Sequence, residues 1–181
     1  MFILAIVVRI ISGKNKGRLI LAPKNLPVRP TTDIAKEALF NILENRYYLD
    51  RKKILDLFSG TGNISLEFAS RGCEDITAID QNFQCTRFIS EMAEELSYHI
   101  NVIQIDCLNF LKKTKVDYDI IFADPPYNFD DYLKLKNKII NRNLVKKDGC
   151  FIIEHDENTK FDDKNVEIRK YGSVHFSIFT F

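Results

Sequence analysis

The chain has 181 residues, of which 45% are hydrophobic and 28% are charged, and its 26 Lys and Arg residues almost balance its 25 Asp and Glu residues. These values predict one soluble domain with a sizeable core, and the net charge alone gives no evidence of nucleic-acid binding. The cysteines are far apart and the histidines have no ligand spacing, which argues against a metal centre or a disulfide framework. These residues are Cys73, Cys85, Cys107 and Cys150, and His99, His155 and His175. We therefore expect reduced core cysteines in a cytoplasmic protein.

The first 30 residues form a basic segment, which we treat as an N-terminal extension to a catalytic domain at 31–181. Residues 1–8 are apolar, too short to span a bilayer and unlike a secretory signal, so they are either a first strand or a non-native extension. Apolar runs at 9–13 and 18–22 flank a lysine-containing loop, which predicts a β-hairpin. No acidic residue precedes Asp33, so the segment either binds a polyanion or is simply a solvated hairpin. Its cations are Arg9, Lys14, Lys16, Arg18, Lys24 and Arg29.

A helix is predicted to begin near Asp33, after a proline-containing connector. Thr31 or Thr32 can cap it, and an aspartate in its first turn suits the helix dipole. Its apolar residues recur at helical spacing, so we expect it to pack on the main sheet. They are Ile34, Ala38 and Ile42, with Ala35, Leu39 and Leu43 beside them.

Residues 53–62 predict a strand followed by a glycine turn, and residues 63–69 predict a helix that ends before Gly72. Glycine lets the backbone approach a ligand closely, and the helix N-terminus presents unpaired N–H groups. A dinucleotide fingerprint requires a third glycine where this chain has Ser65. Asp56 would repel a pyrophosphate but accept hydrogen bonds from an ammonium group. The stretch therefore favours S-adenosylmethionine over a dinucleotide, with an ordinary helix-capping turn as the structural alternative.

Two further strands are predicted at 76–80 and 102–106, and each ends in an aspartate. Asp80 stands where a carboxylate commonly binds the ribose of an adenosine. Asp106 and Cys107 could bind the adenine amino group, or Asp106 could simply cap the helix that follows. The helix between the two strands carries an apolar stripe that indicates core packing. The stripe consists of Cys85, Phe88, Ile89, Met92 and Leu96.

A fourth strand at 119–123, a helix at about 130–141 and a fifth strand at 149–154 continue the alternation. Residues 156–164 leave little room for another helix, and 166–171 with 174–179 predict a closing hairpin. The pattern predicts an α/β, Rossmann-like fold with a doubly wound, mostly parallel sheet and an antiparallel C-terminal edge.

The sequence Asp124-Pro125-Pro126-Tyr127 follows the fourth strand and predicts chemistry on an exocyclic amine. The lone pair of such a nitrogen is delocalised into the base. The Asp124 carboxylate and the Pro125 carbonyl, accepting its two N–H bonds, would localise that lone pair for attack on a methyl group. Tyr127 can stack on the base and hold it in line. Asp124 also favours the positive charge that develops on nitrogen.

Together these motifs resemble the class I S-adenosylmethionine-dependent methyltransferases, and within them the RsmD-type 16S ribosomal RNA guanine-N2 methyltransferases. The resemblance runs from Arg9 to near the C-terminus. The segments that carry it are Arg9–Gly13 with Lys16–Arg18, Arg29–Asp33, Glu37–Asn41, Asp56–Gly62 and Asp124–Tyr127.

The resemblance implies methyl transfer to one guanine amino group of 16S rRNA, in an assembled or assembling small ribosomal subunit, with S-adenosylhomocysteine as the product. It implies a monomer that does not associate with a membrane. The implied cofactor residues are Asp56, Phe58, Gly60, Gly62, Asp80, Asp106 and Cys107, and the implied target site is Asp124, Pro125, Pro126 and Tyr127. The expected RNA-binding residues are Arg9, Lys14, Lys16, Arg18, Arg29 and Thr31.

Two other functions stay open. The amine-gripping motif also suits a DNA or RNA adenine-N6 or cytosine-N4 methyltransferase, although the basic N-terminal segment favours the rRNA family. A non-catalytic RNA-binding assembly factor of the same fold is the third hypothesis. Against this hypothesis, a non-catalytic protein has no physical need for the cofactor-binding acids and the complete target motif.

Overall fold

The computed structural model describes residues 6–23, 26, 31–126 and 128–181. The expectations for residues 1–5, Arg29 and Tyr127 lie outside these residues. No helix among the described residues is long and apolar enough to cross a membrane.

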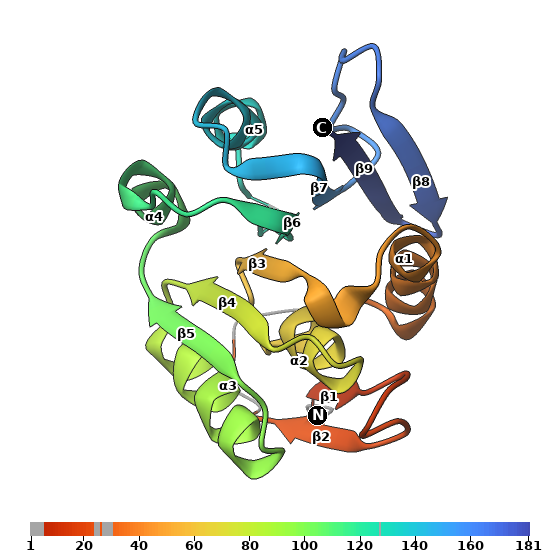
Figure 1. The fold of residues 1–181 in the computed structure, drawn as a ribbon, viewed down its shortest axis with the longest axis vertical. Helices are drawn as coiled ribbons and strands as arrows, with labels where there is room; N and C mark the ends of the chain where they lie inside the picture. The colour runs from red at the N-terminus through yellow and green to blue at the C-terminus, as the bar shows by residue number, and fades with distance from the viewer. Residues whose placement is uncertain (1–5, 24–25, 27–30, 127) are drawn as a thin grey trace.

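The main sheet has seven strands in the order β5-β4-β3-β6-β7-β9-β8 (Figure 1). They are β3 (Lys53–Leu57), β4 (Asp75–Asp80), β5 (Ile100–Gln104), β6 (Tyr118–Ala123), β7 (Val145–His155), β8 (Glu167–Tyr171) and β9 (Val174–Thr180). The first five are mutually parallel, and β9 runs antiparallel to both of its neighbours. The chain builds outward from β3 to β5, then returns to place β6 on the other side of β3. This reversal between β3 and β6 is the point at which such sheets bind ligands.

Helices cover both faces of the sheet, which confirms the predicted doubly wound fold. They are α1 (Asp33–Arg46), α2 (Asn63–Ser70), α3 (Phe83–Glu95), α4 (Cys107–Lys113) and α5 (Tyr132–Asn141). Figure 1 shows α1, α2 and α3 on one face and α4 and α5 on the other. Successive strand residues point to opposite faces, so Ile54 and Ile120 meet α1 and α2, whereas Leu55 and Ile121 meet α4 and α5.

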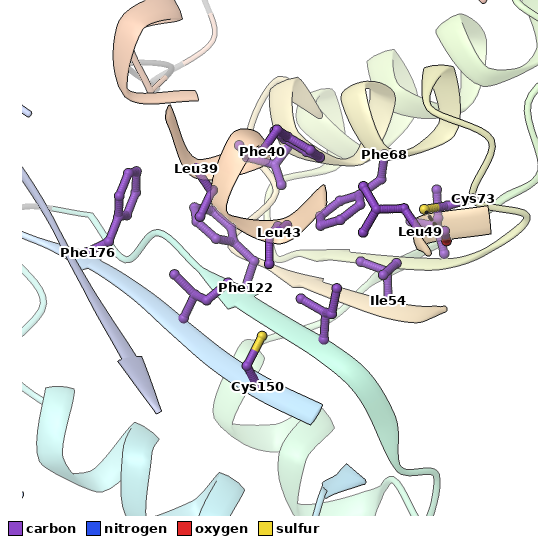
Figure 2. Packing of buried hydrophobic residues seen from close by; sticks show 14 of the residues in the cluster. Leu39, Phe40, Leu43, Leu49, Ile54, Phe68, Cys73, Phe122, Cys150 and Phe176 are labelled. Atoms are coloured by element: carbon purple, nitrogen blue, oxygen red, sulfur yellow. Dashed lines mark hydrogen bonds between the residues drawn. The ribbon is translucent and has the colours of Figure 1, made fainter. Parts of the chain in front are cut away.

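The core between α1, α2 and the sheet is shown in Figure 2. Phe40 and Phe68 meet edge to face there, with ring centroids 4.6 Å apart. The predicted stripe of α1 is partly wrong, because Ile34 is 76% exposed while Lys36 is completely buried. Thr32 caps the helix by accepting a hydrogen bond from the Ala35 N–H.

Two other expectations differ in detail. The third strand of the βαβ series is Ile100–Gln104, two residues earlier than predicted, because Asp106 leaves the sheet to cap α4. Residues 156–166 contain no helix, as expected. Phe161 is buried in that segment and packs against the rings of Phe179 and His155. This aromatic side chain therefore helps α5 to cover one face of the sheet.

The N-terminal hairpin is a separate two-stranded sheet, β1 (Ile6–Arg9) and β2 (Leu19–Ala22), in antiparallel register. Its inner face packs against α2 and α3 through apolar residues. These are Val8, Ile10, Ile20 and Ala22 of the hairpin, Leu66 of α2, and Cys85 and Phe88 of α3, with Leu96 just after it. At Gly13 a Cβ atom would lie 1.9 Å from the Ser70 carbonyl oxygen, so only glycine allows the hairpin to approach α2 this closely. The predicted hairpin is thus confirmed, and it is docked rather than free. Its first strand was predicted wrongly at residues 9–13, because the chain pairs with β2 over Ile6–Arg9 and then turns.

Candidate active site

A cavity of about 580 Å³ lies at the carboxyl ends of the parallel strands, beside the β3–β6 reversal. This volume is in the range of pockets that hold small-molecule ligands. Most of the predicted cofactor and target residues line it. They are Asp56, Phe58, Gly60, Asp80, Asp106, Cys107, Asp124, Pro125 and Pro126. Thr31, which was expected to bind RNA, lines the cavity too. Arg9, Lys14, Lys16, Arg18 and Gly62 do not line it.

The turn between β3 and α2 has an unusual backbone. Phe58 has φ of 59°, a left-handed value that is rare for a bulky residue and that concentrates at functional sites. Gly60 and Gly62 also have positive φ, at 54° and 72°. A Cβ at Gly62 would lie 2.9 Å from Ile89 of α3, so this glycine permits the helices to pack rather than exposing backbone to the cavity.

Asp56 lies at the floor of the cavity and is 1% exposed. Its carboxylate accepts hydrogen bonds from the backbone N–H of Ser65 at 3.1 Å and from the Ser65 hydroxyl. Ser65, which stands where the dinucleotide pattern requires a third glycine, is therefore the residue that orients Asp56. Burial raises the pKa of Asp56 to about 7, against the lowering effect of the Ser65 hydrogen bonds. A ligand ammonium group would favour its ionised form.

Asp80 is fixed by two backbone donors at the end of β4. Gly60 N–H donates to one carboxylate oxygen at 2.9 Å, and Asn82 N–H donates to the other at 2.8 Å. These bonds tie the glycine turn to the neighbouring strand and orient the carboxylate at the cavity wall. Asp106 caps α4 by accepting from Asn109 N–H at 2.9 Å, which confirms its capping role, and it lines the same wall beside the buried Cys107. Its contact with adenine stays a prediction.

Asp124 begins the segment after β6, and its backbone N–H donates to the Leu57 carbonyl at 3.3 Å. Burial raises the pKa of Asp124 well above its ordinary value, and the nearby carboxylates of Glu154 and Asp56 raise it further. The next two residues of the predicted target motif, Pro125 and Pro126, also line the cavity. An ionised acid in such surroundings favours a ligand that donates hydrogen bonds or carries positive charge.

An aromatic wall stands beside the target motif. Phe129 contacts Phe58 and Tyr132 edge to face, with centroids 5.3 and 5.4 Å away, and all three residues line the cavity. The N–H of Phe129 donates to the Pro126 carbonyl at 2.8 Å, which fixes the wall to the motif. Tyr127, the residue predicted to stack on the base, lies outside the described residues.

Glu154 is a cavity residue that reading the sequence did not single out. It lies near the end of β7 and accepts a hydrogen bond from the Thr31 hydroxyl at 2.7 Å. Thr31 is 6% exposed, so it is a buried bridge to Glu154 and not an open RNA contact in this structure. The signal for Glu154 was available, because it is an acid that follows the apolar run of a predicted strand, as Asp80 does.

A second group of buried charges lies where the N-terminal hairpin packs on α2, and it connects the two elements. Glu67 is fully buried and accepts from the backbone N–H groups of Ile11 at 2.8 Å and Ser12 at 3.0 Å. Arg71 binds it at 2.8 Å, and the buried Lys36 ammonium lies 3.4 Å away. This network pairs each buried charge with an opposite one.

Lys36 also connects the hairpin to the cavity wall. Its ammonium group donates to the Arg9 carbonyl and, at 2.7 Å, to the side-chain oxygen of Asn63. Asn63 in turn donates to the Thr31 carbonyl at 3.0 Å. A chain of hydrogen bonds therefore runs from β1 through the start of α2 to Thr31 and Glu154.

The lysine-bearing tip of the hairpin lies away from the cavity. The Lys14 N–H donates to the Ser70 carbonyl at the end of α2, whereas the cavity lies at the start of that helix near Asn63. These two ends are about 10 Å apart at the rise of an α-helix. Lys14 and Lys16 are exposed, and Arg18 forms an ion pair with Glu95 of α3. Their contact with RNA stays a prediction.

Comparison with known proteins decides the family. The model of the family described as "Conserved hypothetical protein 95" matches residues 8–180. The chain belongs to this family. A relative in Buchnera aphidicola subsp. Acyrthosiphon pisum, "Ribosomal RNA small subunit methyltransferase D", is 36% identical over 151 residues, which cover 82% of this chain and 78% of that protein. The predicted RsmD-type membership is therefore confirmed, and the family is one of methyltransferases.

Solved structures agree with this family's fold. A hypothetical protein of Thermus thermophilus superimposes with a TM-score of 0.86 at 27% identity, over 97% of this chain and 100% of that one. The 16S rRNA N2 G1207 methyltransferase of T. thermophilus, solved with AdoMet and guanosine, has a TM-score of 0.74 at 16% identity. That match covers 98% of this chain and 50% of the other, and it shows the fold alone.

Proposed function

We propose that this family member transfers a methyl group from S-adenosylmethionine to the exocyclic N2 amine of one guanine in 16S rRNA of the small ribosomal subunit. The observation that carries the proposal is that one cavity is lined both by the acids of the β3 and β4 ends and by Asp124 with its two prolines. A cofactor site and an amine site within one such cavity suit a direct transfer. The relatives named for small-subunit rRNA methylation support the substrate class.

The cavity residues fit S-adenosylmethionine. Asp56 presents a buried carboxylate to an ammonium group, and Asp80 is held by backbone N–H groups in an orientation that suits ribose hydroxyls. The apolar Ile105 and Cys107 suit an adenine ring, with Asp106 beside them. When bound, the cofactor supplies an electrophilic methyl group on a sulfonium.

Asp124 and the Pro125 carbonyl would hold the two N2 hydrogens of the guanine and turn the nitrogen lone pair toward that methyl group. The N2 lone pair would then form the new bond to the methyl carbon as the sulfur–carbon bond breaks, with the electron pair of that bond left on sulfur. The surplus proton on N2 can pass to the Asp124 carboxylate. Positioning and the electrostatic effect of Asp124 therefore account for the catalysis.

The decisive experiment offers labelled S-adenosylmethionine with three acceptors in parallel. These are small ribosomal subunits that lack native methylation, naked 16S rRNA and duplex DNA, and each product is digested to nucleosides. Label in N2-methylguanosine from the ribosomal acceptors is the expected result, and the preferred acceptor shows whether ribosomal proteins are needed. Label only in N6-methyladenine or N4-methylcytosine would overturn the substrate. No transfer despite cofactor binding would favour an assembly factor.

The hairpin fits an accessory RNA contact in this function. Its exposed lysines lie near the C-terminal end of α2, whereas the cavity lies at the N-terminal end of that helix. They would therefore contact backbone phosphates flanking the target and not the reacting base. A protein with this function would act in the cytoplasm, where ribosomes assemble.

A further inference from the structure

Glu154 and Asp124 occupy matching positions on neighbouring strands. In the parallel pairing of β6 with β7, Phe122 stands opposite Ile152 and Ala123 opposite Ile153. Asp124 and Glu154 are the next residues in that register. Both follow the parity of Phe122 and Ile152, so they face the side of the sheet that α1 and α2 cover. Neighbouring strands are about 4.8 Å apart, which places two carboxylates side by side in one cavity.

Glu154 is held in place by Thr31, the residue before the N-cap of α1. The Thr31 hydroxyl donates to one of its oxygens at 2.7 Å, and the Thr31 carbonyl accepts from Asn63 at 3.0 Å. Asn63 is itself bound by the buried Lys36. The carboxylate is therefore oriented by a buried network, and its side chain is only partly exposed. An acid built into the wall in this way can select between ligands, because it cannot easily turn aside.

The hydrogen-bond acceptors of Asp124, Pro125 and Glu154 match one edge of guanine. That edge carries three hydrogens in a row, one on N1 and two on the N2 amine. Adenine and cytosine instead place a ring nitrogen lone pair beside the amine. Asp124 and the Pro125 carbonyl would accept the two amine hydrogens under the proposed function, which leaves the N1 hydrogen beside the neighbouring acid.

We propose that Glu154 is a specificity-determining residue, whose carboxylate accepts the N1–H of the target guanine and rejects bases that present a lone pair there. This inference rests on the proposed function and adds to it the choice of base. Two carboxylates side by side repel each other, and a base edge that donates to both relieves that repulsion. A lone pair placed against Glu154 would add to the repulsion and replace a hydrogen bond with a contact between two acceptors.

The test replaces the target guanine, once mapped by mass spectrometry of sequence-specific RNase fragments, with 2,6-diaminopurine in 16S rRNA assembled into small subunits. This base keeps the N2 amine but has a lone pair at N1. We expect the wild-type protein to lose about 100-fold or more in kcat/KM on this substitution, because a site built to accept a hydrogen bond rejects an analogue that lacks the donor. Digestion to nucleosides verifies that the label lies on N2.

Glu154→Gln should reduce that discrimination about tenfold or more, because an amide can turn its NH₂ group toward the lone pair. If Glu154→Gln lowers kcat/KM on the guanine and 2,6-diaminopurine substrates by the same factor, the proposal is overturned. Thr31→Val removes the hydroxyl that orients Glu154, and it should narrow the ratio by a smaller factor at unchanged S-adenosylmethionine affinity. If Glu154→Gln fails to bind cofactor, Thr31→Val still tests the proposal. An unchanged ratio of kcat/KM for guanine over 2,6-diaminopurine in Thr31→Val would then count against a role of Glu154 in specificity. Failure of the wild-type protein to methylate the guanine substrate would instead refute the proposed function.

Discussion

Two groups of buried carboxylates are treated differently by the fold. Glu67 is enclosed by two backbone N–H groups and by the charges of Lys36 and Arg71, all supplied by the chain itself. Asp56 is equally buried but receives its hydrogen bonds from Ser65, and burial raises its pKa to about 7. Asp124 is influenced by negative neighbours, which raise its pKa further.

The difference separates an architectural acid from a ligand-binding one. Burying a carboxylate is costly unless it is paired. Glu67 recovers that cost within the fold and docks the hairpin in doing so. Asp56 and Asp124 line the cavity, where a hydrogen-bond donor or a cation of a bound ligand would offset the cost of burying their carboxylates. Perturbed acids in a cleft mark functional sites for this reason.

The strongest way to test this comparison is Asp124→Ala, which removes an acid on the ligand side. We expect turnover to fall about 10²- to 10³-fold, because the amine loses both its acceptor and the charge that stabilises the transition state. Cofactor affinity should change little, since Asp124 is assigned to the target base. Single-turnover methyl transfer and calorimetric titration with S-adenosylmethionine measure the two quantities.

The matched control is Asp131→Ala, which removes a half-exposed acid whose side chain forms an ion pair with Lys134 one turn along α5. It should retain both turnover and cofactor binding. Loss of cofactor binding together with turnover in the Asp124 variant would instead indicate a folding role, and the distinction between the two groups of acids would fail.

Glu67→Gln tests the architectural side. The amide keeps the shape but places an NH₂ group against Lys36 or Arg71 and leaves both cations less well neutralised. Breaking a buried ion pair in this way should lower the free energy of unfolding by about 3 kcal/mol, measured by urea denaturation. Glu94→Gln, at an exposed site on α3, is the control and should change it by less than about 0.5 kcal/mol. A loss below about 1 kcal/mol in the Glu67 variant would show that the network does not hold the fold together.

The pH dependence of cofactor affinity sharpens the contrast further. The pKa of Asp56 is raised to about 7 in the folded protein, so its carboxyl is mostly protonated below that pH. An ammonium group binds the ionised form, and its binding lowers this pKa. Affinity for S-adenosylmethionine should therefore weaken by up to about tenfold per pH unit as the pH falls from about 7 to about 5.5. Calorimetric titration measures this dependence.

Asp56→Asn supplies the reference for this experiment, because it cannot titrate. Its affinity should be weaker at about pH 7.5 and flat across the same range. An equal slope in the wild-type protein and the variant would assign the dependence to another group. The sign also predicts that the stability of the unliganded protein falls as pH rises from about 4 to 7, because the folded state then binds the proton more tightly than the unfolded chain.

The sequence was a good guide to the sheet, since its central strands β3, β4, β6 and β7 are largely buried and contain short apolar runs. It failed where a distant partner decides the outcome. Lys36 looks like a solvent-facing residue of α1, yet it is completely buried because Glu67 and Asn63 reach it from α2. No periodicity within α1 could reveal that pairing.

The site shows the same division. Asp56, Asp80 and Asp124 could be predicted because each lies at or close to the carboxyl end of a strand, and these ends of parallel strands meet at one edge. Glu154 carried this signal too, but its importance depends on Thr31, which lies 123 residues away in the sequence. The docking of the hairpin tip at the far end of α2 also follows from tertiary packing, through Gly13 and Ser70.

The smallest expected effect concerns Lys14 and Lys16, whose tip is separated from the cavity by the length of α2. Charge reversal at both positions should weaken binding to ribosomal RNA about tenfold at low salt and reduce the salt dependence by about two phosphate contacts. Turnover at saturating substrate should stay unchanged, because the tip does not reach the reacting base. Reversal of Lys112 and Lys113, two exposed lysines of α4 on the opposite face of the sheet, is the control of equal charge. Equal weakening by both pairs would show that RNA responds to overall charge and not to the docked hairpin, and unchanged binding in both would remove the hairpin from the RNA interface.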